Sequence, residues 1–153
     1  MADTDLNAGD LTVTITEALT VGHDTASVDL DFAQTYIHTF AGILNTSKRI
    51  FKLANTNLTE VTTFGSTTAD GAFVRADVRY IRVTNLDGTT ALQVGLDDED
   101  SDAGYTSVAA NSSIMYTGTT VEGGHGGTSL VAATALKVKG VADHQLEVFI
   151  ASV

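Results

Sequence analysis

Apolar side chains alternate with threonine or aspartate along several stretches of this chain, and this period of two constrains its fold more than any other feature. Leu11, Val13 and Ile15 are each followed by a threonine, and Val28 and Leu30 are each followed by an aspartate. A half-buried strand needs one apolar and one polar face, which this alternation supplies. No stretch sustains a helical period, although residues 70–76 are expected to form one helical turn. The chain is therefore predicted to be all-β.

The spacing of turn signals predicts roughly eight to ten short strands, a number typical of an antiparallel β-sandwich with a jelly-roll-like arrangement. The chain of 153 residues falls in the size range of one domain. Residues 1–9 precede the first alternating strand and are expected to form a polar N-terminal arm, and residues 10–153 a single β-sandwich domain. The residues expected to line its core are Leu11, Val13, Ile15, Val28, Leu30, Ile81, Val83, Leu92, Val94, Val148 and Ile150.

The charge of the chain argues against nucleic acid as a partner. Nineteen acidic residues against eight basic ones give a net charge of −11, which nucleic-acid phosphates repel. Strand geometry places Lys48 and Lys52 on one face and Arg49 on the other, so these cations form no basic stripe. No apolar run has the length of a membrane span, and no membrane partner is expected. The start of the chain resembles no secretory signal, so folding in the cytoplasm is expected.

An acidic run over residues 97–102 is the candidate metal site. Asp98, Asp100 and Asp102 have the spacing that opens a calcium-binding loop, in which alternate oxygens converge on one cation. However, Ala103 occupies the position of the required glycine, and Ala109 that of the bidentate glutamate. The favoured interpretation is a solvated hairpin tip whose charges discourage aggregation, and no metal is predicted.

The sequence contains no recognisable catalytic or cofactor-binding motif. The glycine-rich segment 122–128 lacks the lysine of a phosphate-binding loop, so we interpret it as a surface contact loop. The four histidines share no metal-ligand spacing, and without cysteine there is no thiol nucleophile or disulfide. No G-x-S-x-G motif is present either. The chain is accordingly predicted to be no enzyme, with no catalytic residues and no cofactor.

Three segments of the chain carry a resemblance to a known class of protein. They are Ser47–Ile50, Arg79–Asp87 and the terminal Leu146–Ser152. In these segments, and in the layout of its strands, the chain resembles small virion structural proteins of tailed bacteriophages, notably marine ones. This resemblance implies a capsid decoration (cement) protein that is located in the virion, forms homo-oligomers and contacts the major capsid protein or other virion proteins.

Several other functions stay open at this stage. A neck, tail or fibre-tip component would fit the same resemblance, and a module that binds carbohydrate or a cell surface would fit the fold class. Exposed aromatic side chains near a loop would favour the binding module, and Tyr105 and Tyr116 are the candidates. A jelly-roll enzyme of the cupin type is disfavoured because the sequence has no His-x-His motif.

Overall fold

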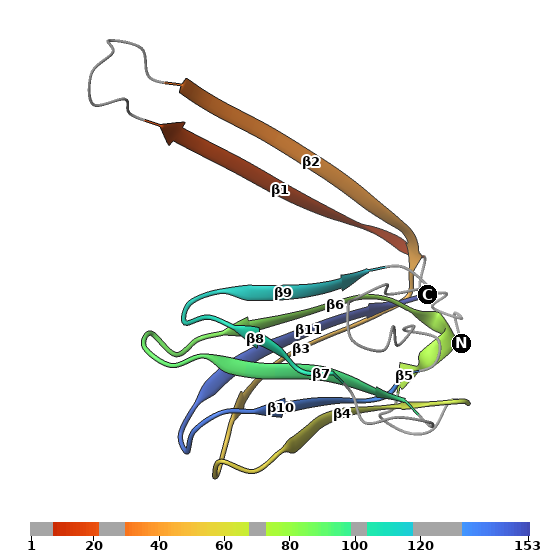
Figure 1. The fold of residues 1–153 in the computed structure, drawn as a ribbon. Coiled ribbons are helices and arrows are strands. Elements are labelled where there is room, and N and C mark those ends of the chain that lie inside the picture. Colours follow the sequence, from red (N-terminus) through yellow and green to blue (C-terminus); the bar gives the residue numbers. More distant parts are fainter. Residues whose placement is uncertain (1–7, 22–29, 68–72, 99–103, 118–132) are drawn as a thin grey trace. The chain divides into compact units, whose positions relative to one another are not determined.

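The fold consists almost wholly of strands, as the alternation predicts. The computed structural model describes residues 8–21, 30–67, 73–98, 104–117 and 133–153. In these residues the only helical element is a 3₁₀ turn, Arg75–Asp77, which overlaps the end of the turn predicted at 70–76; residues 70–72 of that prediction lie outside the described residues. The strands are β1 (Gly9–Val21), β2 (Leu30–Ile43), β3 (Asn45–Lys52), β4 (Thr59–Gly65), β5 (Phe73–Val74), β6 (Val78–Asn85), β7 (Leu92–Asp98), β8 (Thr106–Val108), β9 (Ser113–Thr117), β10 (Ala133–Lys139) and β11 (Gln145–Ser152) (Figure 1).

The chain folds as two compact units, Met1–Ile43 and Leu44–Val153. In the first unit, β1 and β2 form a two-stranded antiparallel sheet of their own. In the second unit, a five-stranded sheet and a four-stranded sheet form the β-sandwich. This division differs from the predicted boundary at residue 10, because the sandwich begins only at Leu44. Of the predicted polar arm, residues 1–7 lie outside the described residues, and Gly9 already belongs to β1.

The strand order of the second unit is that of a jelly roll. One sheet has the order β3-β11-β6-β9 and the other β5-β4-β10-β7-β8. Without β5, the described part of this unit has eight strands in chain order. The first pairs with the eighth (β3 with β11), the second with the seventh (β4 with β10), the third with the sixth (β6 with β9) and the fourth with the fifth (β7 with β8). This is a long antiparallel ribbon rolled into two sheets, as jelly rolls are. The predicted sandwich with jelly-roll-like arrangement is confirmed.

The core of the second unit lies between its two sheets. Ile81 and Val83 of β6, Leu92 and Val94 of β7, and Val148 and Ile150 of β11 are all buried, as predicted. The strands β6 and β11 alternate between buried and half-buried positions over most of their length. The further buried members of this core are Leu53, Phe64, Val78, Leu96, Val108, Ala133, Leu136, Val138 and Leu146.

The predicted core residues of the first unit are not part of this core. Leu11 and Val13 are only half-buried, and Ile15 is exposed. Val28 lies outside the described residues, and of Leu30 only the backbone, the first residue of β2, is described. The alternation correctly predicts strands here. It does not reveal that these strands pair with each other instead of joining the sandwich.

Truncation of a core side chain should destabilise the sandwich strongly. Ile81→Ala and Val148→Ala each remove buried apolar atoms and leave a cavity between the sheets, so we expect a loss of about 1–4 kcal/mol of unfolding free energy for each. Urea denaturation followed by circular dichroism measures this loss. Leu58→Ala is a suitable control, since Leu58 is substantially exposed. Unchanged midpoints for both core variants would contradict the assigned strand faces.

Candidate functional site

The hairpin of β1 and β2 has one apolar face. Residues directly opposite each other in an antiparallel pair lie on the same face, and alternate residues along a strand share that face. The register pairs Leu11 with Phe40, Val13 with His38 and Ile15 with Tyr36, then Glu17 with Gln34 and Leu19 with Phe32. We call the described side chains that follow this register the apolar hairpin face: Leu11, Val13, Ile15, Leu19, Tyr36 and Phe40, together with the polar members Glu17, Gln34 and His38.

The opposite face of the hairpin has a different chemistry. Its register pairs include Thr12 with Thr39 and Thr16 with Thr35. Small polar side chains such as these suit an exposed strand face, because β-branched threonine favours the extended backbone. We call this the threonine face; its described members are Thr12, Thr14, Thr16, Ala18, Ala33, Thr35, Ile37 and Thr39. The hairpin is therefore amphipathic across its thickness.

Part of the apolar hairpin face is open to solvent, whereas Phe40 is buried and Leu11 and Val13 are half-buried. Leu19 is 58% exposed, Tyr36 48% and Ile15 38%. Near the other end of the hairpin, the rings of His38 and Phe40 pack against each other with centroids 4.4 Å apart. A two-stranded hairpin in water is only marginally stable, and three or more strands or a covering element are normally needed. A strand of thirteen residues spans roughly 40 Å, so this face is a long strip that another protein surface would stabilise.

The structure does not describe the three aspartates of the candidate metal site together. Asp98 is the last residue of β7, and only its backbone is described, whereas Asp100 and Asp102 lie outside the described residues. The glycine-rich segment 122–128 also lies outside them. Across the described part of the chain, no three histidine, aspartate or glutamate side chains come together in a way that could hold a metal ion.

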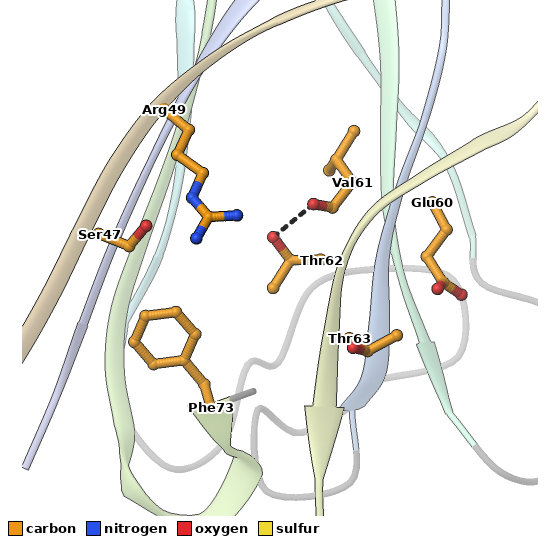
Figure 2. Close-up of a pocket in the computed structure, with 7 residues that line it drawn as sticks. All are labelled: Ser47, Arg49, Glu60, Val61, Thr62, Thr63 and Phe73. Carbon is orange, nitrogen blue, oxygen red and sulfur yellow. Dashed lines mark hydrogen bonds between the residues drawn. The ribbon is translucent and has the colours of Figure 1, made fainter. Parts of the chain in front are cut away.

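A cleft of about 220 Å³ opens at one edge of the sandwich, between β3 of one sheet and β4 and β5 of the other. Its lining residues are Ser47, Arg49, Glu60, Val61, Thr62, Thr63 and Phe73. In Figure 2 the side chains of Ser47, Arg49, Thr62 and Phe73 face a common space, while Glu60 extends away from it on the other side of β4. The chain offers no motif for this cleft, and the sequence analysis did not find it.

The register explains why polar side chains reach this cleft. Ser47 and Arg49 stand opposite Ile150 and Val148, which are buried between the sheets, so Ser47 and Arg49 also lie on the inner face of β3. The prediction that Arg49 points away from Lys48 and Lys52 is thus confirmed. Across the gap, Thr62 stands opposite buried Leu136, which places it on the inner face of β4.

A β-bulge shapes the β4 side of the cleft. Thr62 pairs with Leu136 and Glu60 with Lys137, so Val61 has no opposite residue in β10. Bulges bend a strand and redirect its side chains, and they are common at sheet edges and beside functional sites. The hydroxyl of Thr62 donates to the carbonyl oxygen of Val61 at 2.7 Å, which leaves its oxygen available as an acceptor in the cleft.

Arg49 differs from the other arginines in its contacts. Arg82 pairs with Glu147 at 2.8 Å, Arg79 donates to the carbonyl oxygens of Ala76 and Val78, and Arg75 also has a partner. Among the described residues, no hydrogen bond or ion pair engages the guanidinium of Arg49. Arg49 is exposed, and its guanidinium presents five N–H donors in a planar fork, none of which bonds to a described residue.

The outer face of the four-stranded sheet carries a charged cluster. Glu147 on β11 binds Lys48 of β3 at 3.0 Å and Arg82 of β6 at 2.8 Å. The hydrogen bond from Lys48, with a further one from Arg82, holds the pKa of Glu147 below its usual value. The Arg82 guanidinium also lies 5.9 Å from the centroid of the Phe149 ring, whose edge meets Tyr80. These contacts link three strands of the sheet and indicate a structural role.

The stability of the sandwich should decrease in acid through Glu147. Because its pKa in the folded state is lowered, the stabilisation is present above the ordinary carboxyl value of 4.5 and is lost as the pH falls below it through the folded-state value. Glu147→Gln should therefore lower stability at pH 7 and show a smaller loss between pH 5 and pH 3 than the unmodified protein. Urea unfolding at several pH values tests this.

Asp143→Asn provides the matched control for Glu147→Gln. Asp143 pairs with Lys52 at 2.8 Å, but both side chains are mostly exposed, and exposed pairs contribute little to stability. An equal change in the acid profile of the two variants would contradict the specific role of Glu147.

The candidate aromatic residues for glycan binding differ in their placement. Tyr116 on β9 packs against the core, and burial raises the pKa of its hydroxyl to about 12. Its ring is therefore only partly accessible. The ring of Tyr105 is partly exposed and packs closely over Gly95, where an added Cβ would lie 2.8 Å from its Cδ1 atom.

No family model matches the chain, and neither a curated protein nor a solved structure matches it. In the part of the chain that the structure describes, no helix is long and apolar enough to cross a membrane.

Proposed function

We propose that this protein is a non-enzymatic structural subunit of a tailed-phage particle, a decoration (cement) protein that binds the capsid surface and stabilises it. The observation that carries this proposal is the apolar hairpin face. Leu19, Tyr36 and Ile15 expose apolar surface along a sheet of two strands, and no described side chain of this sheet belongs to the sandwich core. Such a strip gains stability when another protein covers it, which is the situation of a subunit in an assembly.

The second unit supports the same proposal. Its jelly-roll strand order occurs in viral capsid domains as well as in lectins and cupins, so the fold is compatible with the proposal without deciding it. Its core includes buried residues from both sheets, such as Ile81 and Leu136. A well-packed sandwich of this kind can remain folded while the hairpin of the same chain contacts another protein. The resemblance in Ser47–Ile50, Arg79–Asp87 and Leu146–Ser152 favours the phage particle as the setting.

The proposal includes the partners of the subunit. The hairpin contacts the major capsid protein or another virion protein, and copies of the chain associate as a homo-oligomer. A face with one carboxylate, Glu17, allows two proteins of net charge −11 to approach, because little like charge is brought into the contact. Neither nucleic acid nor a membrane takes part.

The test is the location of the chain in purified virions. Particles from an infected culture are banded in a density gradient, heads and tails are separated, and the chain is quantified in each fraction by mass spectrometry. We expect it with the heads, in a fixed ratio to the major capsid protein. Recovery with the tails would replace the decoration role by a neck or tail role. Absence from particles would refute the structural assignment.

A further inference from the structure

The cleft at the sandwich edge breaks the pattern of the fold around it. Inner-face positions of a sandwich are normally apolar, yet the half-buried Ser47 and Thr62 and the exposed Arg49 occupy three of them at this edge. When polar residues occupy inward positions in a fold whose other inward positions are apolar, a functional site is a common reason. An inward charge on an edge strand also discourages edge-to-edge pairing, but that role requires neither a cleft nor the polar residues on β4.

We propose that this cleft binds a sugar acid, a monosaccharide ring that carries a carboxylate. The guanidinium of Arg49 engages no described residue and matches a carboxylate with two parallel hydrogen bonds. In an acidic protein, this unpaired cation is a local site of attraction for an anion. The ligand class goes beyond the proposed particle role, because it concerns recognition of a small molecule by the second unit.

The other lining residues favour a sugar ring over a simple anion. The half-buried ring of Phe73 lies below Arg49 in Figure 2, borders the same space and supplies an apolar surface. The hydroxyl of Ser47 and the acceptor oxygen of Thr62 lie on either side and suit hydroxyl groups of a ligand. At about 220 Å³ the cleft is smaller than the roughly 300 Å³ at which drug-sized sites begin, so it fits one ring and not a large cofactor.

The experiment is a binding titration of the full-length protein with glucuronate, glucose and acetate, followed by NMR. Glucuronate should bind saturably, with shifts confined to the three lining strands. Glucose lacks the carboxylate and acetate lacks the ring, so each should bind at least about tenfold more weakly, since a charge-assisted hydrogen bond contributes enough for that factor. Acetate binding as tightly as glucuronate would overturn the sugar-acid proposal, and so would absence of saturable glucuronate binding.

Variants connect the binding to the cleft. Arg49→Ala should weaken glucuronate binding about tenfold or more, and Arg49→Lys should weaken it less, because a lysine keeps the charge without the bidentate fork. Lys139→Ala is the matched control: it removes one positive charge from β10, outside the cleft, and should leave binding unchanged. Equal loss in Arg49→Ala and Lys139→Ala would show a general charge effect and would refute the site.

A second variant separates binding from folding. Phe73→Leu keeps an apolar side chain against the core but removes the ring, and it should weaken glucuronate binding while acetate binding stays the same. Melting curves of all variants confirm that the sandwich is intact. The sugar-acid proposal is independent of the particle role. If the protein binds glucuronate but is absent from virions, the sugar-acid proposal holds and the decoration role is refuted.

Discussion

Replacing Ile15 and Leu19 together with aspartate should abolish attachment of the protein to its particle while leaving the sandwich folded. Both side chains lie on the apolar hairpin face and are exposed. Loss of each from a contact forfeits about 1.5–3 kcal/mol, and two charges would then face an apolar surface, so binding should fall by about a hundredfold or more. The expected melting temperature is unchanged, since the sandwich core belongs wholly to residues 44–153.

The hairpin itself supplies the matched control. Thr14→Asp with Ala18→Asp adds the same two charges on the same strand, but on the threonine face. This control should bind particles like the unmodified protein in a pelleting assay. Light scattering on both double variants tests self-association in the same way, with loss expected for the apolar-face variant only. Equal binding by the two double variants would show that the hairpin is not the attachment element.

How far the sequence predicts this fold depends on the kind of information that each segment carries. Alternation identifies the strands of β6 and β11 and their inward residues, because a strand buried on one face must repeat with period two. The same reasoning gives the correct faces of Lys48, Arg49 and Lys52 on β3. It does not give the partners of β1 and β2, where the alternation is equally clear but the two strands pair with each other in a separate sheet.

The connections between strands are harder to predict than the strands. Asp87-Gly88 indicates a turn after β6, and the Asp87 carboxylate indeed accepts hydrogen bonds from the backbone N–H groups of Thr89 and Thr90. However, β6 and β7 belong to different sheets, so this turn crosses the sandwich instead of closing a hairpin. Local turn chemistry does not contain that information, because partner choice depends on residues far away in the sequence.

The cleft could not be predicted for a related reason. Arg49 and Phe73 are 24 positions apart, and they meet at the cleft only because β3 and β5 lie at corresponding edges of two sheets. The bulge at Val61, which redirects the side chains of β4, has no glycine to mark it. The sequence does contain two polar residues, Ser47 and Arg49, on the inner face of β3. They can be assigned to that face only once the register of β3 with β11 is known.

The end of β6 also contains a buried polar network that alternation alone does not predict. The side chain of Asn85 is fully buried, and its Nδ2 group donates to the carbonyl oxygens of Thr90, Val108 and Ala109 at 2.8–3.2 Å. Its Oδ1 atom accepts from the backbone N–H of Asp87 and lies 2.7 Å from Nε2 of His144. Because Oδ1 is the acceptor, Nε2 carries the proton in this pair.

Removal of the Asn85 side chain should therefore be among the most destabilising single changes in the sandwich. Asn85→Ala leaves several buried groups without partners at about 1–3 kcal/mol each, so we expect a loss of at least about 3 kcal/mol in urea unfolding. Thr84→Ala, at the neighbouring half-buried position, removes one hydrogen bond to Ser113 and should cost only about 0.5–1.5 kcal/mol. Similar losses for the two variants would contradict the importance of this network.

Two further substitutions identify which half of the amide matters. Asn85→Asp has the same shape but turns an oxygen towards three carbonyl oxygens, so it should destabilise more than Asn85→Ala, in spite of its similar volume. His144→Leu should cost less than Asn85→Ala, since the N–H of Asp87 still satisfies Oδ1 and leucine fills the space of the ring. The order of the three unfolding free energies thus tests the donor role of Asn85. An aspartate cannot donate to the three carbonyl oxygens that this amide joins, so an Asn85→Asp variant as stable as the unmodified protein would refute that role.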